Sequence, residues 1–163
     1  MAIWQFTIAL IPVAWSNQPS NTIESLFSED GYETAKCWAG HQPKSDWCTA
    51  ITSFLPKGKS WNNDLLLWGD DETTDVQAWY SDNVLESINV RIDLRGEVQP
   101  ILEKLVKLTE DLECILFWPE GRMFLQPRIL DLKRAIVQSR PYSFVKNPEA
   151  FLQGINAEGR NAT

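Results

Sequence analysis

The sequence predicts an α+β domain, built on a mainly antiparallel sheet with helices packed mostly on one face. Two observations carry this prediction. The stretch from Leu65 to Arg95 has the pattern of a three-stranded meander, and amphipathic helical segments follow it along the chain. An N-terminal strand and a late strand at 114–118 are expected to extend the meander into a larger sheet.

The central meander is predicted from three segments separated by polar turns. Residues 88–94 alternate apolar and polar side chains, as a strand with one buried face does. Residues 76–80 repeat the alternation, and Leu65–Trp68 is an apolar run that ends at a glycine. The segments at 70–75 and 81–83 are rich in Asp, Asn, Ser and Thr and predict the connecting turns.

The flanking elements follow from apolar runs and helix signals. Ile3–Ile11 is rich in β-branched and aromatic residues and predicts an interior strand that ends at Pro12. After the meander, four apolar residues share one helical face and can lie on the sheet: Ile101, Leu105, Leu108 and Leu112. Other helices are predicted at 21–27, at 45–55 and from Pro127 to the residue before Pro141.

The length and composition predict one domain. A chain of 163 residues with 44% hydrophobic and 23% charged content can bury a sizeable core. We expect residues 1–152 to form this domain and residues 153–163 to be a frayed C-terminal tail. No internal repeat or low-complexity tract divides the chain.

The charge is acidic and unevenly distributed. The net charge is −7, and the 19 acidic and 8 basic side chains of residues 1–120 contrast with the 3 and 7 of residues 121–163. Phosphate binding needs concentrated Lys and Arg, so nucleic acid is not expected as a partner. A basic protein is the natural electrostatic partner of such a surface.

Cysteine usage and the hydrophobic runs predict a cytoplasmic protein. The odd set of Cys37, Cys48 and Cys114 is no disulfide framework and fits a reducing compartment. The apolar segment 8–14 has no preceding Lys or Arg, which favours a first strand over a secretory signal. No run is long enough to cross a membrane, so no membrane association is expected.

The sequence offers no familiar catalytic set. Its single histidine, His41, has no glycine-flanked serine of the nucleophile-elbow type to activate. Cys37, His41 and Cys48 lack metal-ligand spacing, and glycine-rich phosphate loops are absent, so neither a metal nor a cofactor is expected. These absences favour a non-catalytic protein over an enzyme.

One region stands out as a candidate partner-binding surface. Between Asp64 and Asp75 the chain has five acidic residues and no Lys or Arg. The candidate surface combines acids of this region with an aromatic and a basic residue from the following strands: Asp70, Asp71, Glu72, Asp75, Trp79 and Arg91. The alternatives are a merely solvated hairpin turn and, for the outward row at 89–95, structural cross-strand pairs.

Four segments carry a family resemblance. WGDD at 68–71, SINVRIDLR at 87–95, ILFWPEGR at 115–122 and SFVKNPEAFL at 143–152 resemble small uncharacterised bacterial proteins of the polymorphic-toxin immunity type. The resemblance implies an immunity protein that occludes a basic toxin. The competing hypotheses are a small-ligand-binding protein or enzyme with a site of dispersed carboxylates and aromatics, and a structural subunit of a bacterial or phage assembly.

Overall fold

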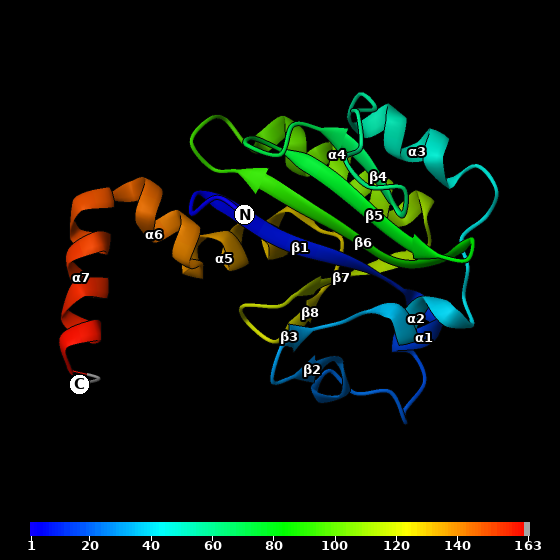
Figure 1. Cartoon of the computed structure of the whole chain (residues 1–163), viewed down its shortest axis with the longest axis horizontal. Coiled ribbons are helices and arrows are strands. Elements are labelled where there is room, and N and C mark those ends of the chain that lie inside the picture. Colours follow the sequence, from blue (N-terminus) through cyan, green and yellow to red (C-terminus); the bar gives the residue numbers. More distant parts are fainter. Residues whose placement is uncertain (162–163) are drawn as a thin grey trace.

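The computed structural model describes residues 1–161, with side chains through residue 154, and centres on a six-stranded sheet in which all the strand pairs are antiparallel (Figure 1). The strand order is β4-β5-β6-β1-β7-β8. The predicted α+β class with a mainly antiparallel sheet is confirmed. The strands are β1 (Gln5–Pro12), β4 (Leu65–Gly69), β5 (Asp75–Ser81), β6 (Val84–Asp93), β7 (Cys114–Trp118) and β8 (Met123–Leu125).

The predicted meander is formed by β4, β5 and β6. Its second turn, Asp82-Asn83, has φ values of 50° and 62°, the left-handed geometry that these two residue types tolerate. Its first turn begins at Gly69, with φ of +78°, where a Cβ atom would lie 2.3 Å from the carbonyl oxygen of Thr74. Glycine is therefore required at the end of β4.

The N-terminal strand occupies the middle of the sheet. β1 pairs with β6 on one side and with β7 on the other, and its side chains are buried on both faces except for Thr7, which is half-buried. This arrangement confirms the interior position that the apolar run predicted. The chain passes from β6 to β7 through α4 (Gln99–Asp111).

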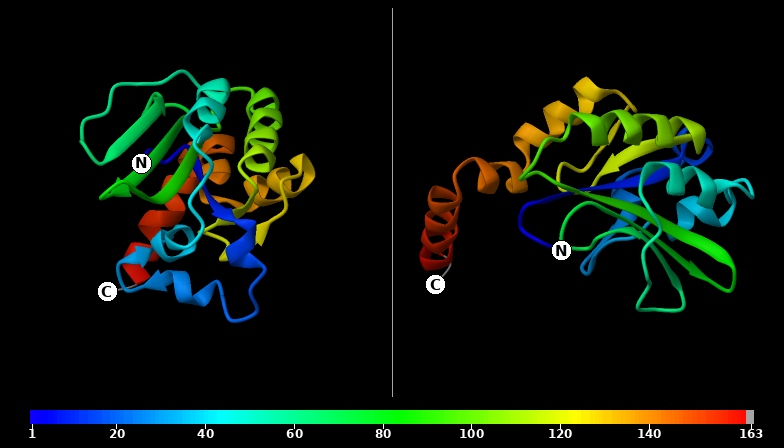
Figure 2. Two further views of the ribbon diagram at one scale, coloured as in Figure 1. Left: turned by 90° about the vertical axis from the view of Figure 1, so that its right-hand side faces the viewer. Right: turned by 90° about the horizontal axis from the view of Figure 1, so that it is seen from above.

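Three helices cover the face of the sheet that is turned away from the viewer in Figure 1: α3 (Trp47–Phe54), α4 and α5 (Ile129–Gln138) (Figure 2). Their buried side chains share one hydrophobic core with the even-numbered residues of β1 and β6. In α4 the buried stripe is centred on Leu102, Leu105 and Leu108, whereas the predicted Ile101 and Leu112 are only partly buried. The apolar pattern located the helix correctly, and the burial of Leu105 and Leu108 is as predicted, whereas Leu102 and Thr109 take the buried positions expected for Ile101 and Leu112.

The opposite face, here called the back face, is turned toward the viewer in Figure 1. Residues 13–46, here called the N-terminal lobe, cover only part of it. Aromatic side chains attach it to the sheet, since Phe27 and Tyr32 each make an edge contact with Phe117 of β7, at 5.8 Å and 5.7 Å. In Figure 1 the middle of β5, β6 and β1 has no helix in front of it. The lobe contains α1 (Val13–Ser16), η1 (Glu24–Leu26), β2 (Phe27–Ser28), β3 (Gly31–Tyr32) and α2 (Ala35–Ala39).

The last two helices extend from one end of the molecule. They are α6 (Arg140–Lys146) and α7 (Pro148–Asn161), and α7 stands apart from the sheet in both figures. Phe151 of α7 contacts Phe144 of α6 with ring centroids 5.7 Å apart. The tail expected at 153–163 falls on the second part of α7, and from residue 155 its side chains lie outside the described residues.

Within the part of the chain that the structure describes, none of the helices combines the length and the apolar character needed to cross a bilayer.

Candidate functional site

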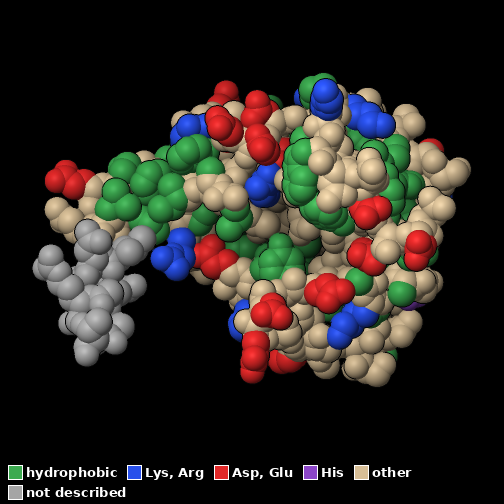
Figure 3. Space-filling view, viewed as in Figure 1, with side chains coloured by type: hydrophobic (Ala, Val, Ile, Leu, Met, Phe, Trp, Pro, Cys, Tyr) green, Lys and Arg blue, Asp and Glu red, His purple; other side chains and the backbone are tan. Residues whose placement is uncertain are grey.

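The candidate site is the uncovered part of the back face, here called the open face. It consists of half-buried side chains from three neighbouring strands, Thr7 of β1, Gln77 and Trp79 of β5, and Asn89 and Arg91 of β6. They share one face because alternate residues of a strand point the same way and the register places Gln77 opposite Asn89. Figure 3 shows a hollow in this face with acidic side chains around it.

The acidic turn, Asp70–Thr74, lies at the edge of the open face and is held in a fixed position. The side-chain amide of the buried Gln5 donates hydrogen bonds to the carbonyl oxygens of Asp71 and Thr73, at 3.0 Å and 2.6 Å. The Trp4 indole N–H donates to the Glu72 carbonyl at 3.0 Å. Since these bonds use backbone oxygens, the carboxylates of the turn remain exposed to solvent and available to a partner.

Asp70 stabilises the turn from within. Its carboxylate accepts a hydrogen bond from the backbone N–H of Glu72 at 2.8 Å, and its carbonyl accepts one from the N–H of Thr73 at 3.1 Å. This is the side-chain-to-backbone pattern by which Asp favours turns. Asp71 and Glu72 form no ion pair within the described chain, but Asp71 lies near enough to Arg91, and Glu72 to Arg95, to help raise the pKa of these arginines.

Asp75 occupies a different environment from the turn. Its side chain is fully buried at the start of β5, and it forms an ion pair with Arg91, the residue opposite it on β6. The Arg91 Nε donates to Oδ1 of Asp75 at 2.8 Å, the guanidinium also contacts Oδ2, and Gln77 donates to Oδ2 at 3.2 Å. These hydrogen bonds from Arg91 occupy the Asp75 carboxylate and raise the pKa of Arg91. A partner can reach this pair only from the side of Arg91, whose side chain is 13% exposed.

Asn89 and Tyr32 connect the open face to the N-terminal lobe. The Tyr32 hydroxyl donates to Oδ1 of Asn89 at 3.1 Å. Burial raises the pKa of Tyr32, although the nearby charge of Arg91 opposes this, so the phenol stays protonated as a donor at neutral pH. No sequence pattern indicated that Tyr32 belongs here, because it reaches Asn89 from β3, which is distant along the chain.

Trp79 lies at the other end of the open face from the acidic turn. It is four residues beyond Asp75, which corresponds to about 13 Å along a strand. Its ring makes an edge contact with Trp61 at a centroid distance of 5.6 Å, and Trp61 is 66% exposed. The structure therefore places Trp79 on the same face as Arg91 but does not bring it next to Asp70, Asp71 or Glu72.

The outward row at the end of β6 forms a second ion pair. Asp93 accepts hydrogen bonds from Arg95 at 2.8 and 2.9 Å, and these bonds lower the pKa of Asp93. Arg95 also stacks over the Trp4 ring at 4.1 Å and donates to the Glu72 carbonyl. Through these contacts with Trp4 and Glu72, Arg95 helps to attach the acidic turn to the sheet.

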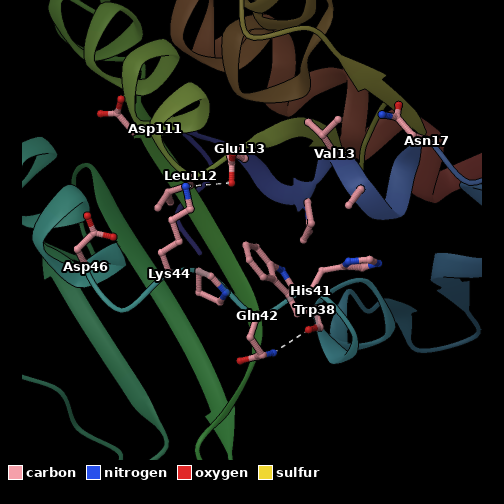
Figure 4. Close-up of a pocket in the computed structure, with 13 residues that line it drawn as sticks. Val13, Asn17, Trp38, His41, Gln42, Lys44, Asp46, Asp111, Leu112 and Glu113 are labelled. Carbon is pink, nitrogen blue, oxygen red and sulfur yellow. Dashed lines mark hydrogen bonds and ion pairs between the residues drawn. The ribbon is translucent and has the colours of Figure 1, made fainter.

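Away from the open face, a cavity of about 550 Å³ lies between α1, the loop after α2 and the end of α4 (Figure 4). His41 and Trp38 line it, and the ion pair of Lys44 with Glu113, 3.6 Å apart, lies at its rim. The Trp38 indole N–H is buried and has no hydrogen-bond partner among the described residues. Gln42, by contrast, uses its amide group on the backbone of Trp38 and Leu85 and serves to fix the loop.

Within the described residues, Cys, His, Asp and Glu side chains do not gather into a group that could hold a metal ion. Cys37, Cys48 and Cys114 are all free thiols. Burial raises the pKa of Cys37 and of Cys114 to about 12, so both thiols are protonated at neutral pH.

Comparison of the whole chain with protein families, with characterised proteins and with solved structures gave no match.

Proposed function

We propose that this chain is a non-catalytic protein-binding domain that binds a basic partner through the open face and its acidic turn. The observation that carries the proposal is the exposed indole of Trp61 in edge contact with Trp79 at the edge of an uncovered sheet face. Aromatic residues held in place at a surface are typical anchors of protein interfaces. Three exposed acidic side chains at the other end of the same face supply the charge that a basic partner would complement.

The immunity version of this proposal adds an identity for the partner. In that version the chain neutralises a basic bacterial toxin by covering its functional surface. The support is the resemblance of four segments to immunity-type proteins together with the acidic charge of residues 1–120. The location proposed is the cytoplasm, since three free cysteines suit a reducing compartment.

The experiment is calorimetric titration of the purified chain with the protein encoded by the neighbouring gene, at low and high salt. We expect binding that weakens as the ionic strength rises, because exposed charges are screened. The variant Asp70→Asn/Asp71→Asn/Glu72→Gln should weaken binding about 10-fold or more. The matched control, Glu103→Gln/Glu110→Gln/Asp111→Asn on α4, removes the same charge from another surface and should bind like wild type. No binding at any salt concentration would contradict the proposal in its immunity version.

A second candidate function is small-ligand binding in the cavity beside Trp38. The Trp38 indole lines this cavity, and its buried N–H has no acceptor among the described residues, which costs about 1–3 kcal/mol. A ligand can accept from this N–H only if the neighbouring side chains shift and expose it. A thermal-shift screen of small carbonyl and carboxylate compounds would test this function. A compound that raises the unfolding temperature of wild type but not of Trp38→Phe supports it, and a screen without stabilising compounds counts against it.

A further inference from the structure

The open face contains a cavity of about 370 Å³ where β5 and β6 meet the N-terminal lobe. Two aromatic side chains border it, Tyr32 from the lobe and Trp79 from the sheet. Glu33 and Glu86 contribute to its lining, as does Asn89, which is hydrogen-bonded to Tyr32. The cavity therefore combines aromatic rings with carboxylates, the two kinds of group that bind organic cations.

Both aromatic side chains are held in position by other contacts. Tyr32 is fixed by its edge contacts with Phe27 and Phe117, at 6.5 Å and 5.7 Å, and by its hydrogen bond to Asn89. Trp79 is half-buried on β5 and makes an edge contact with Trp61. Pre-positioned rings lower the entropic cost of binding, because few side-chain rotations have to be frozen.

The backbone around Glu86 is also fixed. The strand register shifts opposite Trp79 and Tyr80, so that Glu86 is the extra residue of a β-bulge. The Thr34 hydroxyl donates to the Glu86 carbonyl at 3.0 Å and fastens the lobe to the bulge. Bulges redirect side chains, and this bulge lies beside the cavity.

The electrostatic balance of the cavity is negative. Within the described chain neither Glu33 nor Glu86 forms an ion pair. Two cations lie near the cavity in the sequence of its elements. Arg91 of β6 is paired with Asp75, and Lys36, which follows the lining residue Ala35, donates to the Ser25 carbonyl at 2.6 Å. An incoming cation would therefore meet two unpaired carboxylates without a matching repulsion.

We propose that this cavity is a socket for one arginine side chain of the basic partner, an inference that rests on the proposed function and specifies the chemistry of its partner. The planar guanidinium stacks against Trp79 and Tyr32, and its N–H groups donate to the carboxylates of Glu33 and Glu86. Arginine suits the socket better than lysine, because its flat, weakly hydrated cation can stack and form several hydrogen bonds together.

The test uses Nα-acetyl-arginine amide as the probe, titrated into the full chain while the indole N–H resonance of Trp79 is followed by NMR. We expect a saturable shift with a dissociation constant in the millimolar range, typical of a single side chain, and several-fold weaker binding of Nα-acetyl-lysine amide. Nα-acetyl-citrulline amide, which has the same shape without the charge, should produce no shift. An equal shift with citrulline, or no shift with arginine, would overturn the proposal.

Substitutions of the lining residues test whether the arginine probe binds in the socket. Glu33→Gln/Glu86→Gln should weaken arginine binding about 10-fold, and Trp79→Leu, followed through Trp61, should weaken it by a similar factor. The control Glu103→Gln/Glu110→Gln should bind the probe like wild type. Because Trp79→Leu could disturb the sheet, the carboxylate variant decides the outcome, and unchanged binding in that variant would overturn the socket.

The socket and the proposed function can fail separately. If the neighbouring protein binds and responds to the acidic-turn variant but not to Glu33→Gln/Glu86→Gln, the socket is wrong and the function stands. If the arginine probe binds as expected while the neighbouring protein does not bind at all, the socket stands and the function in its immunity version is wrong.

Discussion

The Asp75–Arg91 pair shows at the scale of single residues how this sheet handles a buried charge. Asp75 is fully buried, and its partner is 13% exposed. Asp75→Asn would leave the guanidinium without its counter-charge, and we expect it to lower the free energy of unfolding by about 3 kcal/mol in urea denaturation. The matched change Asp93→Asn breaks a more exposed pair and should cost less than about 1 kcal/mol.

The double variant Asp75→Leu/Arg91→Met tests whether the loss of stability in Asp75→Asn comes from the unpaired charge of Arg91. Replacing both charges with apolar side chains removes the unpaired cation, so stability should return close to that of wild type. If Asp75→Asn cost no more than Asp93→Asn, the pair would not be the buried interaction described above.

The thiols also differ in their surroundings. Burial raises the pKa of Cys37 and of Cys114 to about 12, whereas Cys48 is half-exposed. We expect a thiol reagent at pH 8 to modify at most Cys48 in the native protein and all three cysteines in urea. Rapid labelling of Cys37 or Cys114 under native conditions would contradict this prediction.

The raised thiol pKa values also make stability depend on pH. The folded state holds these protons up to about pH 12, whereas the unfolded chain loses them near its ordinary thiol pKa, about 8.5. Above that pH the unfolded state binds fewer protons, so the free energy of unfolding falls as pH rises. Urea midpoints between pH 8 and 10.5 should therefore fall more steeply for wild type than for Cys37→Ala/Cys114→Ala.

At the scale of elements, the first turn of the meander depends on one glycine. Gly69→Ala would place a Cβ atom 2.3 Å from the Thr74 carbonyl in a left-handed conformation. We expect a loss of about 2 kcal/mol in unfolding free energy, with altered chemical shifts in the acidic turn. Gly96→Ala is the control, because a Cβ atom there meets no neighbour within 4 Å, and its stability should stay within about 0.5 kcal/mol of wild type.

Elements with a strong local pattern could be predicted from the sequence, and contacts between distant segments could not. The alternation at 88–94 and the helical pattern after it identified β6 and α4, since both patterns reflect one buried face. The acidic turn was predicted because polar residues between two apolar strands can form little else.

The candidate site was harder to predict because its parts come from separate elements. The sequence pattern placed Asp75 in the acidic turn, yet it is the first residue of β5 and is paired with Arg91 on the neighbouring strand. Tyr32 reaches Asn89 over 57 positions of sequence, and nothing near either residue indicates the other. Trp61 stood in a loop, and only the fold brings it to Trp79.

At the scale of the whole molecule, the last helix, α7, is separable from the sheet. α7 contacts α6 through Phe151, whereas the sheet is covered by α3, α4 and α5. Truncation after Lys146 should therefore leave the core intact and shift the unfolding temperature by no more than about 3 °C. The arginine probe should bind the truncated chain like wild type, because no residue of α7 lines the socket. A cooperative loss of structure on truncation, seen as collapsed dispersion in NMR spectra, would instead make α7 part of the folding unit.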